Sequence, residues 1–156
     1  MQQNHEALAD TLNELIRINF DRVFGYEKAA SEVEDHDIDL KAMFNGFANV
    51  SRQYIAHWQQ EVRALGQEPA EDSTVRGKVY RVWMDMKSTI TGHDRESILN
   101  SCVFGEKAAI DAYEDALSTE THLPDEHRVE IASQKAELQA AHRAMEMYAH
   151  AHEKVG

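Results

Sequence analysis

Apolar residues recur every three or four positions along almost the whole chain, which is the spacing of one face of an α-helix. The two prolines, several of the glycines and a few acidic clusters interrupt this pattern. The interruptions divide the chain into five predicted helices, with approximate ranges 4–34, 37–65, 74–92, 94–118 and 124–156. The third is shorter than the others, so the pattern predicts an all-α protein with four main helices.

The residues at the ends of these segments are typical of helix termini. Asp37 and Asp94 precede apolar stripes and are expected to be N-caps, because a short polar side chain accepts hydrogen bonds from free backbone amides. Gly66 follows the second stripe at a position where glycine commonly ends a helix. Pro124 stands at the start of the last helix. Short linkers after the first and fourth helices predict two antiparallel hairpins.

The connection between the hairpins determines the expected topology. Segment 67–93, if largely helical at about 1.5 Å per residue, is long enough to cross much of the bundle. Two hairpins joined by one long crossover form the ferritin-like topology. The alternative is an up-down bundle with a helix on its surface. We therefore expect an all-α, ferritin-like four-helix bundle with an extra helix in the crossover, formed by residues 1–156 as a single domain.

Net charge and cysteine content limit the partners and the cellular compartment that we expect for the protein. The net charge of −12 repels phosphate backbones and anionic lipids, so we expect no nucleic-acid partner and no membrane partner. The first residues lack the basic and apolar regions of a signal peptide, and no apolar run is long enough to span a membrane. The single cysteine, Cys102, lies in an apolar stretch, which predicts a buried, unreactive thiol in a reducing compartment. We expect a cytoplasmic location.

Several phrases resemble a known group of proteins. They are LNELI and GYEKAA in the first helix, GKVYRVWMDMKSTITGHDRESIL, CVFGEKAAIDAYEDAL, and the pattern Q…AELQAAHRAM in the last helix. In this order they resemble an uncharacterised bacterial ferritin-like four-helix-bundle family, a domain of unknown function. The resemblance covers nearly the whole chain and implies a ferritin-like fold without implying an activity. The usual pattern of the group has arginine where this chain has Phe104.

Ferritin-like oxidases suggest what metal ligands to look for. Such proteins hold two iron or manganese ions with a glutamate from each of two helices and Glu-x-x-His from each of the other two. The motifs of this chain are incomplete, because Tyr54 stands in place of the glutamate before His57, and Gln139 in place of the glutamate before His142. Two of the expected carboxylates are therefore missing.

The other candidate ligands lie in a phrase that occurs twice, as VFGYEKAA and as VFGEKAA, and supplies Glu27 and Glu106. Counting residues along each helix from one end of the predicted bundle places Glu27 at the same height as His142. The same count places Glu106 about a turn and a half away from that height. His57 lies further still. Glu106, Glu27 and His142 remain the candidate metal ligands, but the full set does not converge on one two-metal centre, whose ions lie about 3.5–4 Å apart. Glu27 and His142 are also compatible with a small mononuclear site or with an ordinary hydrogen-bonded histidine.

Glu106 lies on an apolar stripe, and a buried carboxylate needs a partner. Arg52 is predicted at nearly the same depth, and the fork of its guanidinium group suits a carboxylate. We therefore predict a buried Arg52–Glu106 pair, joined by Asn19, Gln139 or Tyr26, in the position of a lost metal. A metal ion at Glu106 and a solvated Glu106 remain as alternatives.

Three glycines inside helices are unexpected, since glycine costs about 1 kcal/mol relative to alanine there. Gly25, Gly46 and Gly105 are predicted to lie in one layer, where we expect close approach of neighbouring helices to explain them. Unequal distances from Gly25 and Gly105 to their hairpins argue against a true duplication of the repeated phrase.

Two classes of function follow. The first is a non-enzymatic bundle with a stress-linked or scaffolding role, a homo-oligomer such as a dimer, and no cofactor. The second is an iron- or manganese-binding protein with oxidase, peroxidase or storage activity. The incomplete ligand set favours the first class. The chain has no phosphate-binding loop or nucleophile elbow that would indicate a hydrolase or transferase.

Overall fold

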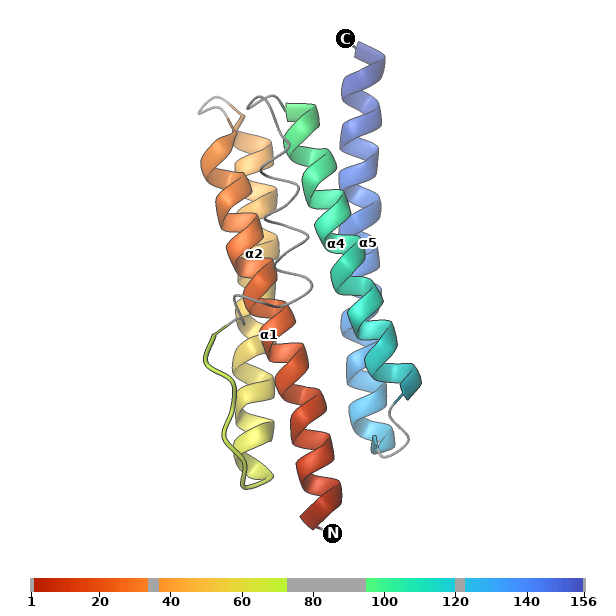
Figure 1. Cartoon of the computed structure of the whole chain (residues 1–156). Helices are drawn as coiled ribbons and strands as arrows, with labels where there is room; N and C mark the ends of the chain where they lie inside the picture. Colours follow the sequence, from red (N-terminus) through yellow and green to blue (C-terminus); the bar gives the residue numbers. More distant parts are fainter. Residues whose placement is uncertain (1, 34–36, 73–94, 120–122, 156) are drawn as a thin grey trace.

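The computed structural model describes residues 2–33, 37–72, 95–119 and 123–155. Within these ranges the chain forms four long helices and no strand (Figure 1). They are α1 (Gln2–Glu32), α2 (Ile38–Ala64), α4 (Arg95–Thr119) and α5 (Asp125–Val155). The predicted all-α bundle is confirmed. The predicted crossover helix at 74–92 lies outside the described residues.

The helices pack as two antiparallel hairpins. α1 lies beside α2, α4 lies beside α5, and α1 also packs against α4. Figure 1 shows that α2 and α4 run in the same direction, which excludes the alternative up-down bundle. The predicted topology of two hairpins with a long connection is therefore correct.

The apolar stripes of the four helices meet along the axis of the bundle. Tyr26 of α1 packs against Phe44 and Phe47 of α2, with ring centroids 6.0 and 5.2 Å apart. Completely buried apolar side chains come from all four helices, among them Leu12, Leu15, Leu40, Trp58, Leu99, Tyr113, Ile131 and Met145. The helical spacing of the sequence thus identifies the core faces correctly.

At the two ends of α2, the structure confirms the predicted role of Gly66 and changes the predicted role of Asp37. Gly66 has φ +77°, and the amides of Gly66 and Gln67 donate to the carbonyls of Arg63 and Val62, a Schellman motif that closes α2. Asp37 stands at the N-cap of α2, but its side chain makes no capping hydrogen bond. It pairs instead with Arg95 at the start of α4. Asp94 lies outside the described residues.

Cys102 is buried, with 1% of its surface exposed. Burial raises the pKa of its thiol well above the ordinary value, because the apolar surroundings disfavour a thiolate. The prediction of a buried, unreactive thiol is consistent with this environment. Among the described helices, none is long and apolar enough to cross a membrane.

Candidate functional site

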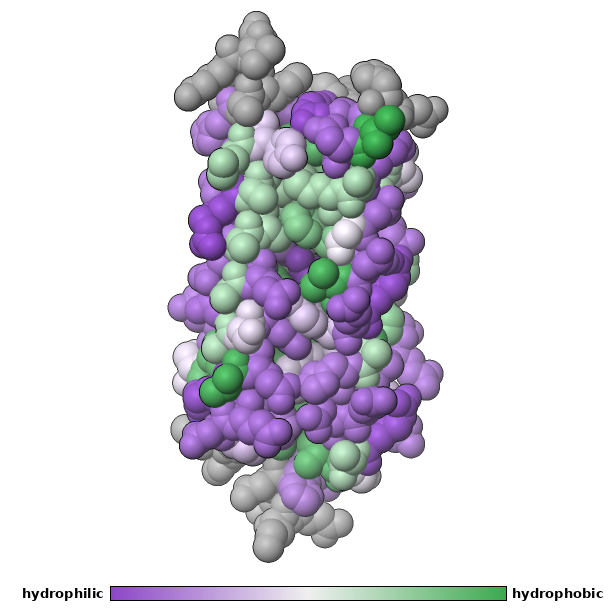
Figure 2. Space-filling view, turned by 180° about the vertical axis from the view of Figure 1, so that it is seen from behind, coloured by the Kyte–Doolittle hydropathy of each residue, from purple (hydrophilic) through white to green (hydrophobic). Residues whose placement is uncertain are grey.

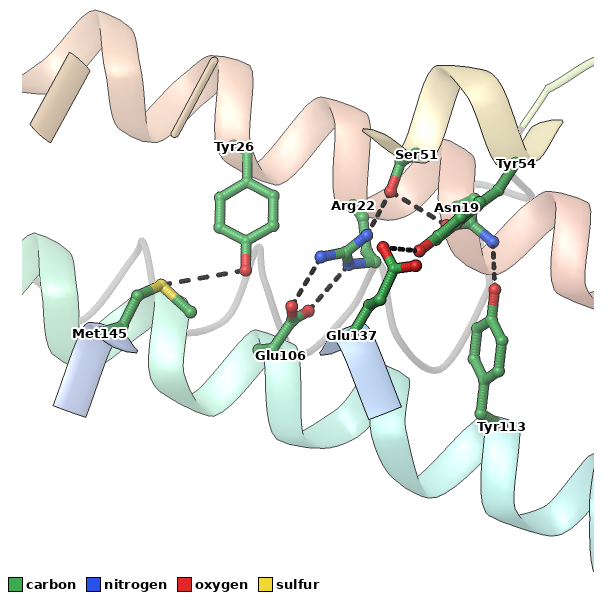
Figure 3. Close-up of polar contacts among 9 residues, drawn as sticks. All are labelled: Asn19, Arg22, Tyr26, Ser51, Tyr54, Glu106, Tyr113, Glu137 and Met145. Atoms are coloured by element: carbon green, nitrogen blue, oxygen red, sulfur yellow. Dashed lines mark hydrogen bonds and ion pairs between the residues drawn. The ribbon is translucent and has the colours of Figure 1, made fainter. Parts of the chain in front are cut away.

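A buried ion pair joins α1 to α4 inside the bundle (Figure 3). Arg22 of α1 donates from Nε and Nη2 to the two carboxylate oxygens of Glu106 on α4, at 2.8 and 2.6 Å. Only 2% of the Arg22 side chain and none of the Glu106 side chain is exposed. This bidentate arrangement satisfies both carboxylate oxygens of Glu106 without a metal ion.

Polar side chains extend the pair along the core. Arg22 Nη1 donates to Ser51 of α2, and Ser51 donates to Asn19 Oδ1 at 2.9 Å. Asn19 Nδ2 lies 2.8 Å from the hydroxyl oxygen of Tyr113 on α4. Tyr113 in turn donates to Gln134 of α5 at 2.7 Å. One network therefore connects all four helices, and its central polar groups have partners, as burial requires.

The network keeps its charged and neutral members in defined states. Burial disfavours the charge on Arg22, but the Glu106 carboxylate outweighs burial, and the net result is a raised pKa of Arg22. Burial also raises the pKa values of Tyr26 and Tyr113, so both phenols are protonated at neutral pH. The centre contains one cation, one carboxylate and neutral hydroxyl groups.

The predicted partner of Glu106 was wrong. Arg52 is 47% exposed and pairs at 2.8 Å with Glu27 on the surface. Arg52 was predicted at the right height along the bundle, because the neighbouring residue Ser51 belongs to the network. However, adjacent residues point about 100° apart around a helix at 3.6 residues per turn, so Arg52 faces solvent. The predicted involvement of Asn19 is confirmed, and the cation is Arg22.

The centre does not fit the two-metal site of ferritin-like oxidases. Such a site needs inward-facing glutamate and histidine side chains from four helices. At the level of the ion pair, α1 supplies the Arg22 cation and α2 supplies Ser51, while α5 supplies Leu138 and Ala141. Glu106 is the carboxylate of this network, and Arg22 engages both its oxygens. A metal ion there would have to displace the guanidinium group.

The three predicted ligands have separate partners. Glu106 pairs with Arg22, Glu27 pairs with Arg52, and His142 Nδ1 lies 3.1 Å from Glu146 one turn along α5. Within the described residues they do not form a cluster of metal-ligating atoms. A metal-binding role for these three residues stays a prediction.

The structure brings a different set of ligands together at the edge between α2 and α5. His57 Nε2 lies 2.5 Å from Glu130 Oε2 and 3.9 Å from Glu61 Oε1. All three ligand atoms lie within 4.8 Å of one another, and the side chains are partly buried. In the described part of the chain, this is the one group of three or more such residues that could hold a metal ion. We call it the edge cluster.

The sequence contained part of the signal for the edge cluster. His57 was identified from a degenerate motif, and Glu61 stands at i+4, which places both on one face of a helix. Glu130 lies on α5, 73 residues further along the chain than His57. Only the lateral packing of α5 against α2 shows that Glu130 completes the group.

A pocket lies on the same side of the bundle as the edge cluster, further toward the N-terminus of α2. It has a volume of about 300 Å³, and Arg22, Tyr54, Glu137 and several alanines of α5 contribute to its lining. Tyr54 donates to Glu137 Oε2 at 2.5 Å (Figure 3). Figure 2 shows a hollow near the middle of the back face, with mainly hydrophobic residues above it and hydrophilic residues below.

Comparison with known proteins gives a family and a fold. The family model described as Domain of unknown function (DUF2383) matches residues 7–119. No curated protein matches the chain.

Solved structures with similar folds cover almost the entire chain. A Dps1 mutant from Mycobacterium smegmatis has a TM-score of 0.80 at 12% identity, covering 96% of this chain and 99% of its own. A ferritin-like diiron-carboxylate protein from Bacillus anthracis has a TM-score of 0.74 at 16% identity, with the same coverage, 96% and 99%. The dodecameric thioferritin of Bacteroides fragilis, a bacterioferritin-related protein, has a TM-score of 0.74 at 21% identity, covering 97% and 89%. The fold of this chain is therefore that of a ferritin-like bundle.

The expectation of no cofactor was wrong. It rested on the incomplete motifs of the bundle centre, where Arg22 engages both carboxylate oxygens of Glu106. It overlooked the edge cluster, whose three ligand atoms converge. It is also contradicted by the similar structures, one of which is described as a diiron-carboxylate protein. The expectation of a bundle without a metal is therefore withdrawn.

Proposed function

The chain belongs to the family described as Domain of unknown function (DUF2383), and on this premise we propose that it is a ferritin-like protein that binds iron or manganese at the edge cluster. One observation carries the proposal: the ligand atoms of His57, Glu61 and Glu130 lie within 4.8 Å of one another. The proposal replaces the non-enzymatic bundle that the incomplete motifs favoured.

The ligand set suits these ions chemically. Imidazole is a donor that suits iron and carboxylate is a donor that suits manganese, so a set of one histidine and two glutamates is compatible with either ion. His57 is 41% exposed and Glu130 is 31% exposed, so an ion and a small substrate can reach the cluster from solvent. The net charge of −12 also raises the local concentration of cations near the surface.

The residues of the cluster have distinct roles in this proposal. Iron or manganese, when bound, supplies one-electron redox chemistry at a position open to solvent. His57 offers Nε2 as a nitrogen ligand, and Glu61 and Glu130 offer negative charge that favours a divalent cation. The 2.5 Å contact between His57 and Glu130 holds the cluster together before an ion binds. Oxidase, peroxidase and storage activities are each compatible with this arrangement.

We further propose that the chain is a homo-oligomer in the cytoplasm. The solved structure from Bacteroides fragilis is described as dodecameric, which supports assembly of this fold into homo-oligomers. The expectation of a dimer in particular gains no support from the similar structures, one of which is described as dodecameric. The reduced, buried Cys102 is compatible with a cytoplasmic location.

Metal binding can be tested directly with purified, untagged protein. We expect titration with Mn²⁺, or with Fe²⁺ under anaerobic conditions, to show about one ion per chain, as a single mononuclear ligand set provides. His57→Ala removes the nitrogen ligand and should weaken binding by at least about tenfold, the lower end of what supporting residues of metal sites contribute. Elemental analysis and calorimetry measure both quantities.

His142→Ala is the matched control. His142 and Glu146 also form a histidine–glutamate pair at i and i+4 on a helix surface, but they belong to no cluster of three ligands in the described part of the chain. We expect His142→Ala to bind metal as the wild type does. Loss of metal in His142→Ala with full retention in His57→Ala would contradict the proposal and favour the site first predicted from Glu27 and His142.

A further inference from the structure

The pocket in the seam between α2 and α5 has no part in the proposed function. The backbones of α2 and α5 approach each other less closely than those of α1 and α2, of α4 and α5, or of α1 and α4. The pocket has a volume of about 300 Å³, at the lower end of the range of ligand sites in proteins. Its walls are mainly apolar, and their side chains are Phe47, Val50, Leu138, Ala140, Ala141 and Ala144.

Small side chains on α5 keep the seam open at this height. Ala140, Ala141 and Ala144 each offer a single methyl group to it. Further along the seam, longer side chains meet across it, as Trp58 does when it donates to Gln134 Oε1 at 2.9 Å. Atoms that line an apolar gap lack packing partners on one side, so an apolar group that enters gains contacts and leaves water. The walls therefore suit the apolar body of a ligand.

The charges of the lining decide which sign of ligand the pocket suits. Arg22 belongs to the lining, but its three guanidinium nitrogens already donate to Glu106 and Ser51. The carboxylate of Glu106 compensates the Arg22 cation, which therefore offers little attraction to an anion. Glu137, an exposed residue, supplies the uncompensated charge of the described lining.

Tyr54 holds the carboxylate of Glu137 in place (Figure 3). Its hydroxyl donates to Glu137 Oε2 at 2.5 Å, whereas Oε1 has no hydrogen-bond or ion-pair partner among the described residues. Burial and this hydrogen bond raise the pKa of Tyr54, so its phenol stays protonated and donates at neutral pH. Phe47 and Tyr54 also bring aromatic rings to the pocket, and aromatic rings attract cations.

We propose that this pocket binds a small organic cation, with its apolar body against Val50 and the alanines of α5 and its ammonium group at Glu137 Oε1. An organic anion of the same size is disfavoured by the charge of Glu137 and by the net charge of −12. A bare metal ion is not suited either, because it needs several donor atoms and the walls are apolar. The inference does not depend on metal binding at the edge cluster.

Three probes of similar shape test the sign of the charge: 2-phenylethylammonium, the neutral 2-phenylethanol and the anion 3-phenylpropanoate. At low salt we expect the cation to bind about two- to fivefold more tightly than the alcohol, as a partly exposed charge pair contributes, and the anion to bind more weakly than the alcohol. NMR titration measures the affinities, and the methyl signals of Val50, Leu138 and Ala140 should shift with the cation. Equal affinities for all three probes, or shifts at His57 in place of these methyl groups, would overturn the proposal.

Glu137→Gln isolates the charge, because glutamine retains the size of the side chain and an acceptor for Tyr54. We expect it to lower the affinity for the cation to that for the alcohol and to leave the alcohol unaffected. Asp10→Asn is the matched control, since Asp10 is exposed on α1, lies outside the pocket lining, and changes the net charge equally. It should retain the preference for the cation. A preference lost in both variants would assign it to the net charge and contradict a site at Glu137.

Ala144→Leu isolates the apolar walls, because the larger side chain occupies the pocket. We expect the cation and the alcohol both to lose binding. Ala136→Leu is the control, as Ala136 is exposed on α5 outside the lining, and it should bind both probes as the wild type does. Circular dichroism checks that both variants fold, which is expected because leucine is a good helix former. Wild-type binding in Ala144→Leu would place the probes elsewhere and refute the proposal.

Discussion

The Arg22–Glu106 pair encloses two full charges in the core of a bundle. Such a pair is compensated by its own geometry, because the bidentate contact and the hydrogen bond to Ser51 replace much of the lost hydration. The phrase that occurs twice in the sequence shows that a shift of one residue along a helix decides whether a glutamate is buried or exposed. The residue after the glycine is Tyr26 in one copy and Glu106 in the other, and both are fully buried. Glu27, one residue further, faces solvent and pairs with Arg52.

Removal of one partner should be far more harmful than removal of both. We expect Arg22→Ala to lower the free energy of unfolding by about 3–5 kcal/mol, because it leaves the Glu106 carboxylate buried without a counter-ion. The double variant Arg22→Met, Glu106→Leu should recover most of this loss, since apolar side chains of similar size need no partner. Urea unfolding followed by circular dichroism measures these values.

Arg52→Ala is the control for this experiment. Arg52 is 47% exposed, and exposed ion pairs contribute about 0–1 kcal/mol. A loss in Arg52→Ala as large as that in Arg22→Ala would contradict the assignment of Arg22 as the partner of Glu106.

Gly46 inside α2 and Gly66 just after its end illustrate how the effect of glycine depends on its place relative to a helix. Gly66 closes the helix at φ +77°, in the left-handed region that disfavours a side chain. Gly46 lies within α2 and is exposed. Apart from its chain neighbours and the backbone of its own helix, no atom of the described residues lies within 4 Å of the place where a Cβ would stand. The expectation that close helix packing explains Gly46 was therefore wrong. Its reason is not evident from the structure.

Alanine substitution at these two positions should change stability in opposite directions. Gly66→Ala should lower the free energy of unfolding by about 1–2 kcal/mol through left-handed strain. Gly46→Ala should raise it by about 0.5–1 kcal/mol, since alanine is the better helix former and no clash opposes it. Thermal and urea unfolding of the two variants test this pair, and destabilisation by Gly46→Ala would reveal a packing role for that surface.

At the scale of the whole molecule, the two hairpins are joined by the packing of α1 on α4 and by the polar network across all four helices. Net charge −12 is a property of the complete surface and affects assembly. Like charges on two copies repel, so contacts between copies should strengthen as salt screens them.

If the chain assembles as proposed, native mass spectrometry should detect a homo-oligomer at a multiple of the chain mass of 17.8 kDa. We expect the oligomeric fraction to increase between low and physiological ionic strength, because the Debye length falls to about 8 Å at 0.15 M. Light scattering at the same protein concentrations provides an independent measure. A single-chain species under all of these conditions would contradict the proposed assembly.

The sequence by itself determined the helices, their buried faces, the hairpins and the need of Glu106 for a cation. These properties follow from helical spacing, helix-capping residues and the cost of burying a charge, all of which act locally along the chain. Tertiary structure decided that Arg22 is this cation and that Glu130 meets His57. The physical reason is that helical spacing assigns a residue to a face of its own helix, whereas contacts between helices depend on their rotation and register, which only the packed bundle fixes.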